Sequence, residues 1–303
     1  MVMEIDTKKK LVAKLSIISN VVLTLLKIIA GIISGSISII SEAIHSMGDL
    51  FASALTLFSV TKSSQPADDD HPYGHGKYED MSGFIEGGLI ILAALYIIYE
   101  SVKKIILGVH MEPENYLGIV VMLIAVIMNI IVSFLLFKVA KESNSISLYA
   151  DGEHLRTDIY SSLGVLLGLI LIKITGYSVL DPIIAILVAI IIFRAGYIIC
   201  KKTCANLLDQ SLPIENIDKI KQIIKTHENV TLKENSIKAR QAGTIIDIDI
   251  ILKFNETTTI CECYKICDDI EKQIQVIYPN CSISIHPEPV CYKKNCQESC
   301  KNS

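Results

Sequence analysis

Two pairs of polar residues with the same spacing interrupt apolar stretches of the chain. His45 is followed four positions later by Asp49, and His154 is followed four positions later by Asp158. In a helix, residues at i and i+4 project from the same face with their Cβ atoms about 6 Å apart. Each pair can therefore supply two ligands to one metal ion.

The cost of placing aspartates in apolar helices favours a metal site over simple packing. An aspartate at the centre of a bilayer helix costs roughly 2.5–3.5 kcal/mol on insertion scales. One histidine alone would more simply be a hydrogen-bonded packing residue, but two such pairs indicate a divalent cation held by two imidazoles and two carboxylates. This ligand set suits tetrahedral Zn²⁺, with Cd²⁺, Co²⁺, Fe²⁺ and Mn²⁺ as alternatives.

Charge balance suggests how such a site would operate. Two aspartates carry two negative charges, which one divalent cation neutralises. Protons can replace the metal, because the ligands must be deprotonated to bind it. Histidine has a reference pKa near 6.5 and so exchanges protons at cellular pH. The site therefore predicts a transporter that exchanges metal for protons by alternating access.

The elements that must carry these residues are membrane helices. The chain has 303 residues, of which 51% are hydrophobic, and its mean hydropathy is +0.47. Crossing a hydrocarbon core takes about 20 residues, and six stretches are long enough, at roughly 11–34, 37–61, 82–107, 115–137, 147–173 and 179–200. Gly83 and Gly87 have the spacing that lets membrane helices approach closely. The two polar pairs fall in the second and fifth stretches.

The lysines near the ends of these stretches predict the orientation. One side would carry the lysines at 8, 9, 10, 14, 62, 77, 138, 141, 201 and 202, and the other side those at 103, 104 and 173. Cytoplasmic loops carry the excess of basic residues, so we expect both termini in the cytoplasm and a multi-pass protein of the cell inner (plasma) membrane. The first stretch is too long for a signal peptide and should remain as an anchor.

A polar loop at 63–77 separates the second and third stretches. It contains Asp68, His71 and His75 within a Gly- and Pro-rich segment. This spacing indicates a metal site, and the alternative is a solvated polar turn. We therefore assign residues 1–205 to a six-helix transmembrane domain with this cytoplasmic loop.

Residues 206–290 have the pattern of a small soluble α+β domain. A helix is expected at 213–227, and strands at 232–241 and 245–254. Thr257 or Thr258 would begin a helix through Ile277, and a final alternating strand covers 281–286. This αββαβ order predicts a ferredoxin-like cytoplasmic domain.

All nine cysteines follow residue 199, which in a reducing cytoplasm favours free thiols or metal ligands over disulfides. Cys263 and Cys267 share a helix face. A tail at 291–303 adds Cys291, Cys296 and Cys300, either as metal ligands or as incidental thiols of a loose end. The net charge of −4 gives no sign of nucleic-acid binding.

The paired His-x-x-x-Asp spacing, the loop from Pro66 to Lys77 and the αββαβ domain together resemble the cation diffusion facilitator family, from Lys10 to about Pro289. The resemblance implies a proton-coupled zinc exporter, a homodimer that pairs through its cytoplasmic domains, and loop ligands Asp68, His71 and His75. In the cytoplasmic domain it points to Asp249, His286 and Glu288, either as a weak oxygen-rich site or as a plain polar strand edge.

Other classes of function remain open from sequence. A membrane-embedded metalloenzyme could use the same ligands, but the chain has no His-Glu-x-x-His run, and four protein ligands leave no position for a catalytic water. Flux measurements would distinguish an active transporter from a passive channel or a metal sensor. We expect a secondary transporter rather than an enzyme.

Overall fold

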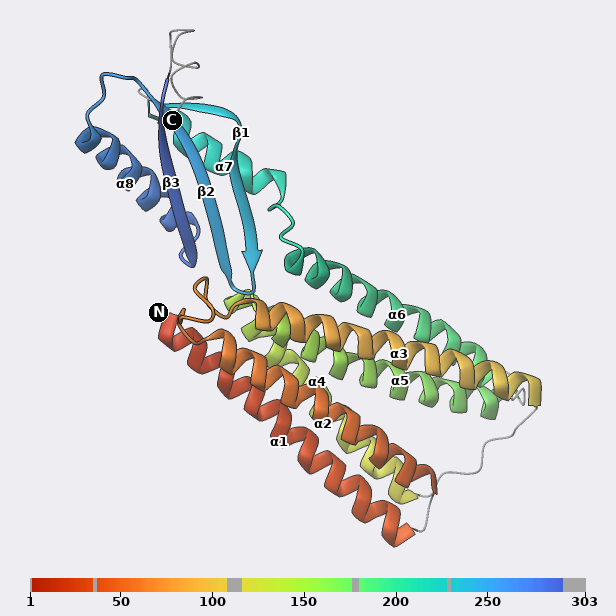
Figure 1. The fold of residues 1–303 in the computed structure, drawn as a ribbon. Coiled ribbons are helices and arrows are strands. Elements are labelled where there is room, and N and C mark those ends of the chain that lie inside the picture. The colour runs from red at the N-terminus through yellow and green to blue at the C-terminus, as the bar shows by residue number, and fades with distance from the viewer. Residues whose placement is uncertain (1, 35–36, 108–115, 176–179, 228–229, 291–303) are drawn as a thin grey trace. The chain divides into compact units, whose positions relative to one another are not determined.

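The structure is a computed structural model that describes residues 2–34, 37–107, 116–175, 180–227 and 230–290. Side chains are described there except at 2–4, 34, 37–42, 44, 116–119, 165–175, 181 and 233–235. The chain divides into two compact units, Met1–Leu207 and Leu208–Ser303 (Figure 1). The described elements of the first unit are all helices, and the second unit combines helices with a sheet.

The first unit contains six long helices, as the sequence predicted. They are α1 Val2–Ser34, α2 Ile37–Ser63, α3 Lys77–Leu107, α4 Tyr116–Ser143, α5 Ile146–Thr175 and α6 Leu180–Leu207. Within the described residues, α1, α3, α4 and α6 each contain a window apolar enough to cross a membrane. The other two, α2 and α5, have 27 and 30 residues, which is long enough to cross a membrane. These two helices carry the His-x-x-x-Asp pairs.

Two groups of helices meet along α5. An apolar cluster that includes Val12, Leu136 and Leu155 joins α1, α2, α4 and α5. A second cluster, which includes Ile90 and Ile192, joins α3 and α6 to α5. Polar residues of α5 also contact both α2 and α3, since Asp151 accepts from Ser53 of α2 and Ser147 Oγ lies 3.3 Å from Ser82 Oγ of α3.

A buried ion pair ties α1 to α3. Lys9 Nζ lies 2.6 Å from Glu79 Oε1, and the two side chains are 2% and 0% exposed. Ser63 Oγ donates to the same carboxylate at 2.8 Å, and the Ser145 hydroxyl donates to its other oxygen. Glu79, in the first turn of α3, thus contacts the end of α2, the residue just before α5 and the N-terminal part of α1.

Glycines bring α3 and α6 into close contact. A Cβ added at Gly87 would lie 2.8 Å from Cys200 Sγ, and one added at Gly83 would lie 2.9 Å from Thr203 Cγ2. On the facing helix, a Cβ at Gly196 would lie 2.9 Å from the Gly87 carbonyl oxygen. The close packing predicted for Gly83 and Gly87 is confirmed.

This contact gives a stability prediction with an internal control. Gly87→Val places two methyl groups against α6, and overpacking of this kind costs about 1–3 kcal/mol. Gly88→Val is the matched control, because nothing lies within 4 Å of a Cβ at Gly88. We expect thermal unfolding in detergent micelles to show a lower midpoint for Gly87→Val than for Gly88→Val. Equal midpoints would contradict the close approach of α3 and α6.

The second unit has the predicted αββαβ order. Its elements are α7 Ile214–Lys225, β1 Val230–Ala242, β2 Ile245–Phe254, α8 Ile260–Ile277 and β3 Cys281–Pro289. The sheet order is β1-β2-β3, with β1 antiparallel and β3 parallel to β2. Buried side chains of β2, such as Ile248 and Ile250, pack against Ile220 of α7 and Ile270 of α8. The two helices therefore cover one face of the sheet.

The beginning of α8 differs from the prediction. The N-cap is Thr259, not Thr257 or Thr258. Thr259 accepts a hydrogen bond from the Glu262 backbone, and the Glu262 carboxylate accepts one from the Thr259 N–H. This reciprocal pair needs an acidic residue three positions after the cap, and Glu262 has that spacing only from Thr259.

Candidate metal centre

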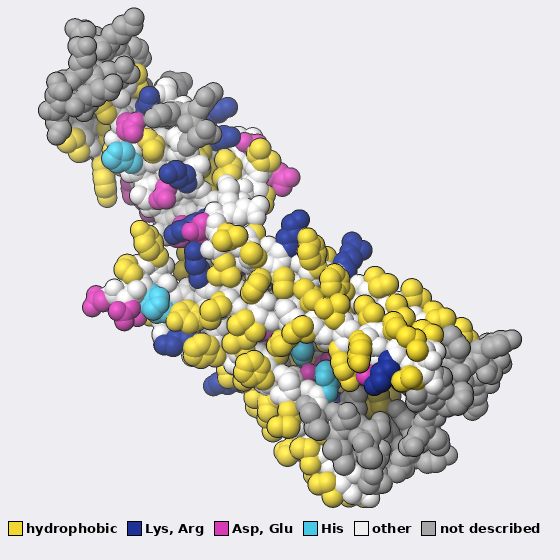
Figure 2. All heavy atoms as spheres, turned by 45° about the vertical axis from the view of Figure 1, so that its right-hand side comes forward, with side chains coloured by type: hydrophobic (Ala, Val, Ile, Leu, Met, Phe, Trp, Pro, Cys, Tyr) yellow, Lys and Arg dark blue, Asp and Glu magenta, His cyan; other side chains and the backbone are white. Residues whose placement is uncertain are grey.

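The four predicted intramembrane residues meet between α2 and α5. One ligand atom each from His45, Asp49 and Asp158 lie within 4.8 Å of one another. His154 joins them through Asp49, since its Nε2 lies 3.2 Å from Asp49 Oδ1. Figure 2 shows His and acidic side chains among the hydrophobic ones that cover much of this unit. The i, i+4 spacing on each helix is what places each pair on one face.

The geometry differs in one respect from four equivalent ligands. The mutually close group contains His45, Asp49 and Asp158, while His154 is turned toward Asp49. Asp49 and His154 are each 7% exposed, and His154 Nδ1 has no hydrogen-bond partner among the described residues. A buried carboxylate takes an available donor, which explains the contact between His154 and Asp49. The arrangement offers three ligand atoms around one point and a fourth side chain in contact with one of them.

A polar stripe on α1 lies against the same part of α2. It consists of Ser16, Asn20, Thr24 and Lys27, which are all buried. Asn20 Nδ2 donates to Ser53 Oγ at 2.6 Å, and Lys27 Nζ donates to Ser46 Oγ at 2.7 Å. Thr24 Oγ1 donates to the Ser46 carbonyl oxygen at 3.2 Å. This stripe was not predicted as part of the site, although its spacing of four, four and three residues places its members on one face of a helix.

Two further carboxylates, one on α5 and one on α3, are buried and were not predicted as site residues. Asp151 and Glu86 are both 0% exposed. Ser53 Oγ donates to Asp151 at 3.3 Å, while Ser82 Oγ donates to Glu86 at 3.0 Å and the Thr56 hydroxyl donates to the same oxygen. One oxygen of each carboxylate has no hydrogen-bond partner among the described residues. Buried acidic groups in a membrane helix mark functional positions more often than packing positions.

The loop between α2 and α3 gathers its three predicted ligands. Asp68 Oδ2 lies 3.4 Å from His75 Nε2, and Asp68 Oδ1 lies 3.5 Å from His71 Nδ1. The His71 backbone N–H donates to Asp68 Oδ1 at 2.7 Å, which holds the pKa of this carboxyl below its usual value. The Pro66 carbonyl lies 3.2 Å from His75 Nδ1 and so leaves His75 Nε2 directed at Asp68. The three side chains form a second compact set of metal-ligand atoms.

The three residues predicted in the soluble unit do not come together in this way. Asp249 of β2 pairs with Ser284 of β3. Glu288 of β3 pairs with Lys253, which is four residues further along β2 than Asp249. Those rows are roughly 13 Å apart along a strand. Only the two sets described above have three close ligand atoms within the described residues. Asp249, His286 and Glu288 therefore share a sheet face without forming a compact site in one chain.

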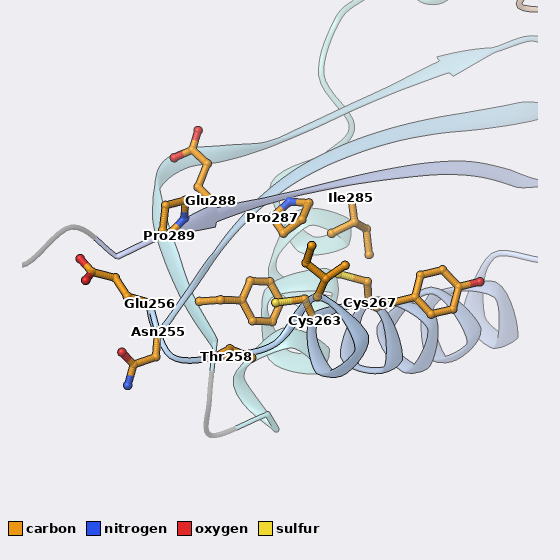
Figure 3. Close-up of a pocket in the computed structure, with 12 residues that line it drawn as sticks. Asn255, Glu256, Thr258, Cys263, Cys267, Ile285, Pro287, Glu288 and Pro289 are labelled. Carbon is orange, nitrogen blue, oxygen red and sulfur yellow. The ribbon is translucent and has the colours of Figure 1, made fainter. Parts of the chain in front are cut away.

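The thiols of α8 line an apolar pocket. Cys263 and Cys267 lie on one face of the helix, below Ile285, as Figure 3 shows. The carboxylates of Glu256 and Glu288 point away from them in the same view. The pocket has a volume of about 340 Å³ and is also lined by Phe254, Asn255, Thr258, Ile260, Tyr264, Pro287 and Pro289. The described lining thus supplies no third ligand beside the two thiols, and Cys291, Cys296 and Cys300 lie outside the described residues.

Comparison with known proteins covers both units. The model of the cation efflux transmembrane domain matches residues 13–208. The model of the cation efflux protein cytoplasmic domain matches residues 212–290. An uncharacterized transporter of Synechocystis is 32% identical over 265 residues, which are 88% of this chain and 85% of that protein.

Two further relatives have names that describe a function or a location. The cation-efflux pump FieF of Shewanella oneidensis is 26% identical over 281 residues, covering 93% of this chain and 94% of the pump. The magnetosome protein MamB of Magnetospirillum gryphiswaldense is 28% identical over 266 residues, covering 86% and 87%. The matches therefore extend over nearly the whole length of each protein.

Proposed function

Because the chain belongs to the cation diffusion facilitator family of divalent cation efflux transporters, we propose that it exports Zn²⁺ from the cytoplasm in exchange for protons. Members of this family are transporters, so the metalloenzyme alternative is set aside. The observation that carries the proposal is the meeting of His45, Asp49 and Asp158 between two helices, with His154 beside them. These four residues are the proposed transport site.

The ligand types support zinc as the substrate. Imidazole nitrogen and carboxylate oxygen together suit Zn²⁺, whereas Mn²⁺ is better served by oxygen alone. Cd²⁺, Co²⁺, Fe²⁺ and Mn²⁺ are the competing substrates. Their ranking is measured by competition against Zn²⁺ uptake into proteoliposomes. We expect Zn²⁺ to be preferred, and a stronger preference for Fe²⁺ or Mn²⁺ would replace zinc in the proposal while leaving the site unchanged.

The charge of the site supports proton exchange. Asp49 and Asp158 bring two negative charges into a low-dielectric interior, where net charge is costly. One Zn²⁺ balances them during export, and protons on the ligands balance them during the return. Helices α2 and α5 carry one ligand pair each, and α5 also packs in a second cluster with α3 and α6. A relative movement of these helices would open the site to alternate sides of the membrane.

Flux in sealed vesicles tests this coupling. Purified protein is reconstituted, the membrane voltage is clamped with valinomycin and potassium, and Zn²⁺ uptake is measured with and without an imposed pH gradient. We expect an outwardly directed proton gradient to drive Zn²⁺ accumulation above equilibrium. Zn²⁺ uptake that is equal with and without the pH gradient would refute antiport. Zn²⁺ that only equilibrates across the membrane would indicate a channel. Vesicles that contain the Asp158→Ala variant measure the passive leak of Zn²⁺.

We propose that the loop set of Asp68, His71 and His75 is a second, non-transporting metal site. Asp68→Asn should weaken zinc binding by the loop at least about tenfold, because a neutral amide replaces the carboxylate shared by both histidines. Binding is measured on full-length protein that also carries Asp158→Ala, so that the transport site contributes little. Asp70→Asn is the matched control, being exposed in the same loop but outside the set.

The pH response of the same loop follows from the lowered pKa of Asp68. A carboxyl whose folded pKa is depressed contributes stability above its ordinary pKa and loses that contribution as the pH falls through the lowered value. We therefore expect the hydrogen bond from the His71 N–H to persist to a pH below about 3.9, the ordinary value for Asp. Carbon-13 NMR of the Asp68 carboxyl checks this. A midpoint at or above the ordinary value would contradict it.

The remaining proposals concern assembly and orientation. The match of residues 212–290 to the family's cytoplasmic domain supports a homodimer that pairs through this unit. The lysine distribution supports cytoplasmic termini and a multi-pass protein of the inner membrane. Cross-linking in native membranes tests the dimer, and protease protection of tagged termini tests the orientation. Asp249, His286 and Glu288 remain ligand candidates only if a second chain completes their site.

A further inference from the structure

A lysine lies beside the proposed transport site. Lys27 is on α1, and the residue is 9% exposed. Its Nζ donates to Ser46 Oγ at 2.7 Å, and Ser46 directly follows His45 on α2. Ser46 lies three residues before Asp49 and so projects from nearly the same face of α2. A cation is therefore held next to the proposed metal site, where Asp49 and Asp158 have ligand atoms within 4.8 Å of each other.

The contacts of α1 fix Lys27 at this level of the membrane unit. One turn earlier, Thr24 donates to the Ser46 carbonyl, and Asn20 donates to Ser53 one turn after Asp49. Lysines in apolar helices usually extend along the helix toward the membrane surface. Lys27 is instead directed at the α2 turn that carries the metal ligands. Its position is set by a continuous polar interface, not by one contact.

We propose that Lys27 is a tethered counter-ion that competes with the metal for the carboxylates of Asp49 and Asp158. The inference rests on the proposed function, in which these residues bind the transported ion. With Zn²⁺ bound, the lysine repels the metal; after release, it offsets the negative charge that the metal leaves behind. Charges interact more strongly in a low-dielectric interior than in water. Lys27 thereby limits metal affinity, favours release and restrains the empty site from binding other cations.

Equilibrium binding of Zn²⁺ measures this effect without transport. The assay uses full-length protein in detergent at one pH, a fluorescent zinc chelator as competitor, and a His71→Ala/His75→Ala background that removes the loop site. Lys27→Gln removes the charge and keeps a donor for Ser46, while Lys27→Met removes both. We expect both variants to bind Zn²⁺ roughly tenfold or more tightly than the Lys27 parent, because the repulsion is gone. In proteoliposomes both should turn over more slowly at saturating Zn²⁺.

Three matched variants separate charge from structure. Lys27→Arg keeps the charge, Ser46→Ala removes the hydrogen bond but keeps the lysine, and Lys14→Met alters an exposed lysine on the same helix. All three should stay within about threefold of the parent affinity. If Lys27→Met does not fold, Lys27→Gln and Lys27→Arg still provide the comparison.

The outcomes distinguish this inference from the proposed function. Unchanged or weaker Zn²⁺ binding in folded Lys27→Gln would overturn the counter-ion role, as would equal tightening in Ser46→Ala. Asp49→Ala is measured in the same assay. If Asp49→Ala binds Zn²⁺ as the parent does, the transport site itself has been misplaced. If Asp49→Ala loses binding while Lys27→Gln matches the parent, only the role of Lys27 fails.

Discussion

Replacement of Asp49 or Asp158 by alanine is expected to reduce metal export to the background of empty vesicles. Asp49 lies in the mutually close group and also contacts His154, so its loss removes one proposed ligand and leaves another without its contact. Loss of Asp158 leaves α5 with only His154 at the site. Neither change should unfold the protein, since removing an aspartate from an apolar helix relieves roughly 2.5–3.5 kcal/mol of insertion cost. Zinc flux and the amount of inserted protein are measured on the same vesicles.

Asp70→Ala is the control for a lost carboxylate, because Asp70 is exposed and belongs to neither set of close ligand atoms. It should transport like the parent protein. A folded Asp49→Ala or Asp158→Ala variant that exports Zn²⁺ at the parent rate would remove these residues from the transport site. Loss of insertion in both variants would instead assign them a structural role.

The largest expected effect on stability comes from separating Lys9 and Glu79. Lys9→Met leaves the fully buried Glu79 carboxylate with hydroxyl donors but without its counter-charge. Breaking a buried pair by removing one partner costs about 3–5 kcal/mol. Glu79→Gln should cost less, because Lys9 Nζ keeps the Asp6 carboxylate at 3.7 Å. Thermal or denaturant unfolding in detergent micelles gives the free-energy change.

A double-mutant cycle isolates the interaction. Lys9→Met/Glu79→Gln should be less destabilised than the sum of the single variants, because neither side is left with an uncompensated charge. Lys14→Met, an exposed lysine on α1, should change stability by less than about 0.5 kcal/mol. Additive single effects, or a Lys9→Met variant as stable as Lys14→Met, would show that the pair does not hold α1 to α3.

The sequence predicted the parts of the site that depend on local spacing. His45 with Asp49, and His154 with Asp158, are visible because i, i+4 neighbours share a face in any helix. The partner surface on α1 was not predicted. Lys27 sits in a helix whose overall apolarity marks it as an ordinary membrane span. Its contact with Ser46 depends on how α1 packs against α2, which sequence spacing within one helix does not specify.

The soluble unit shows the same limit. The strand at 245–254 was predicted with its observed bounds, because its alternation is local and strong. The metal set of Asp249, His286 and Glu288 depended on the register between β2 and β3. That register places Asp249 beside Ser284 and not beside His286 or Glu288. Pairing between strands separated by a helix leaves no local pattern in the sequence.

The polar faces of α2 and α5 bear on how the protein enters the bilayer during synthesis. Asp49 and Asp158 raise the cost of inserting these two helices singly. The polar face of α2 meets the helix made before it, because Ser46 and Ser53 accept hydrogen bonds from Lys27 and Asn20 of α1. The polar face of α5 instead meets α2, through His154 and Asp49. Helix α2 should therefore leave the translocon as a hairpin with α1, and the proposed metal site would form only when α5 meets that hairpin.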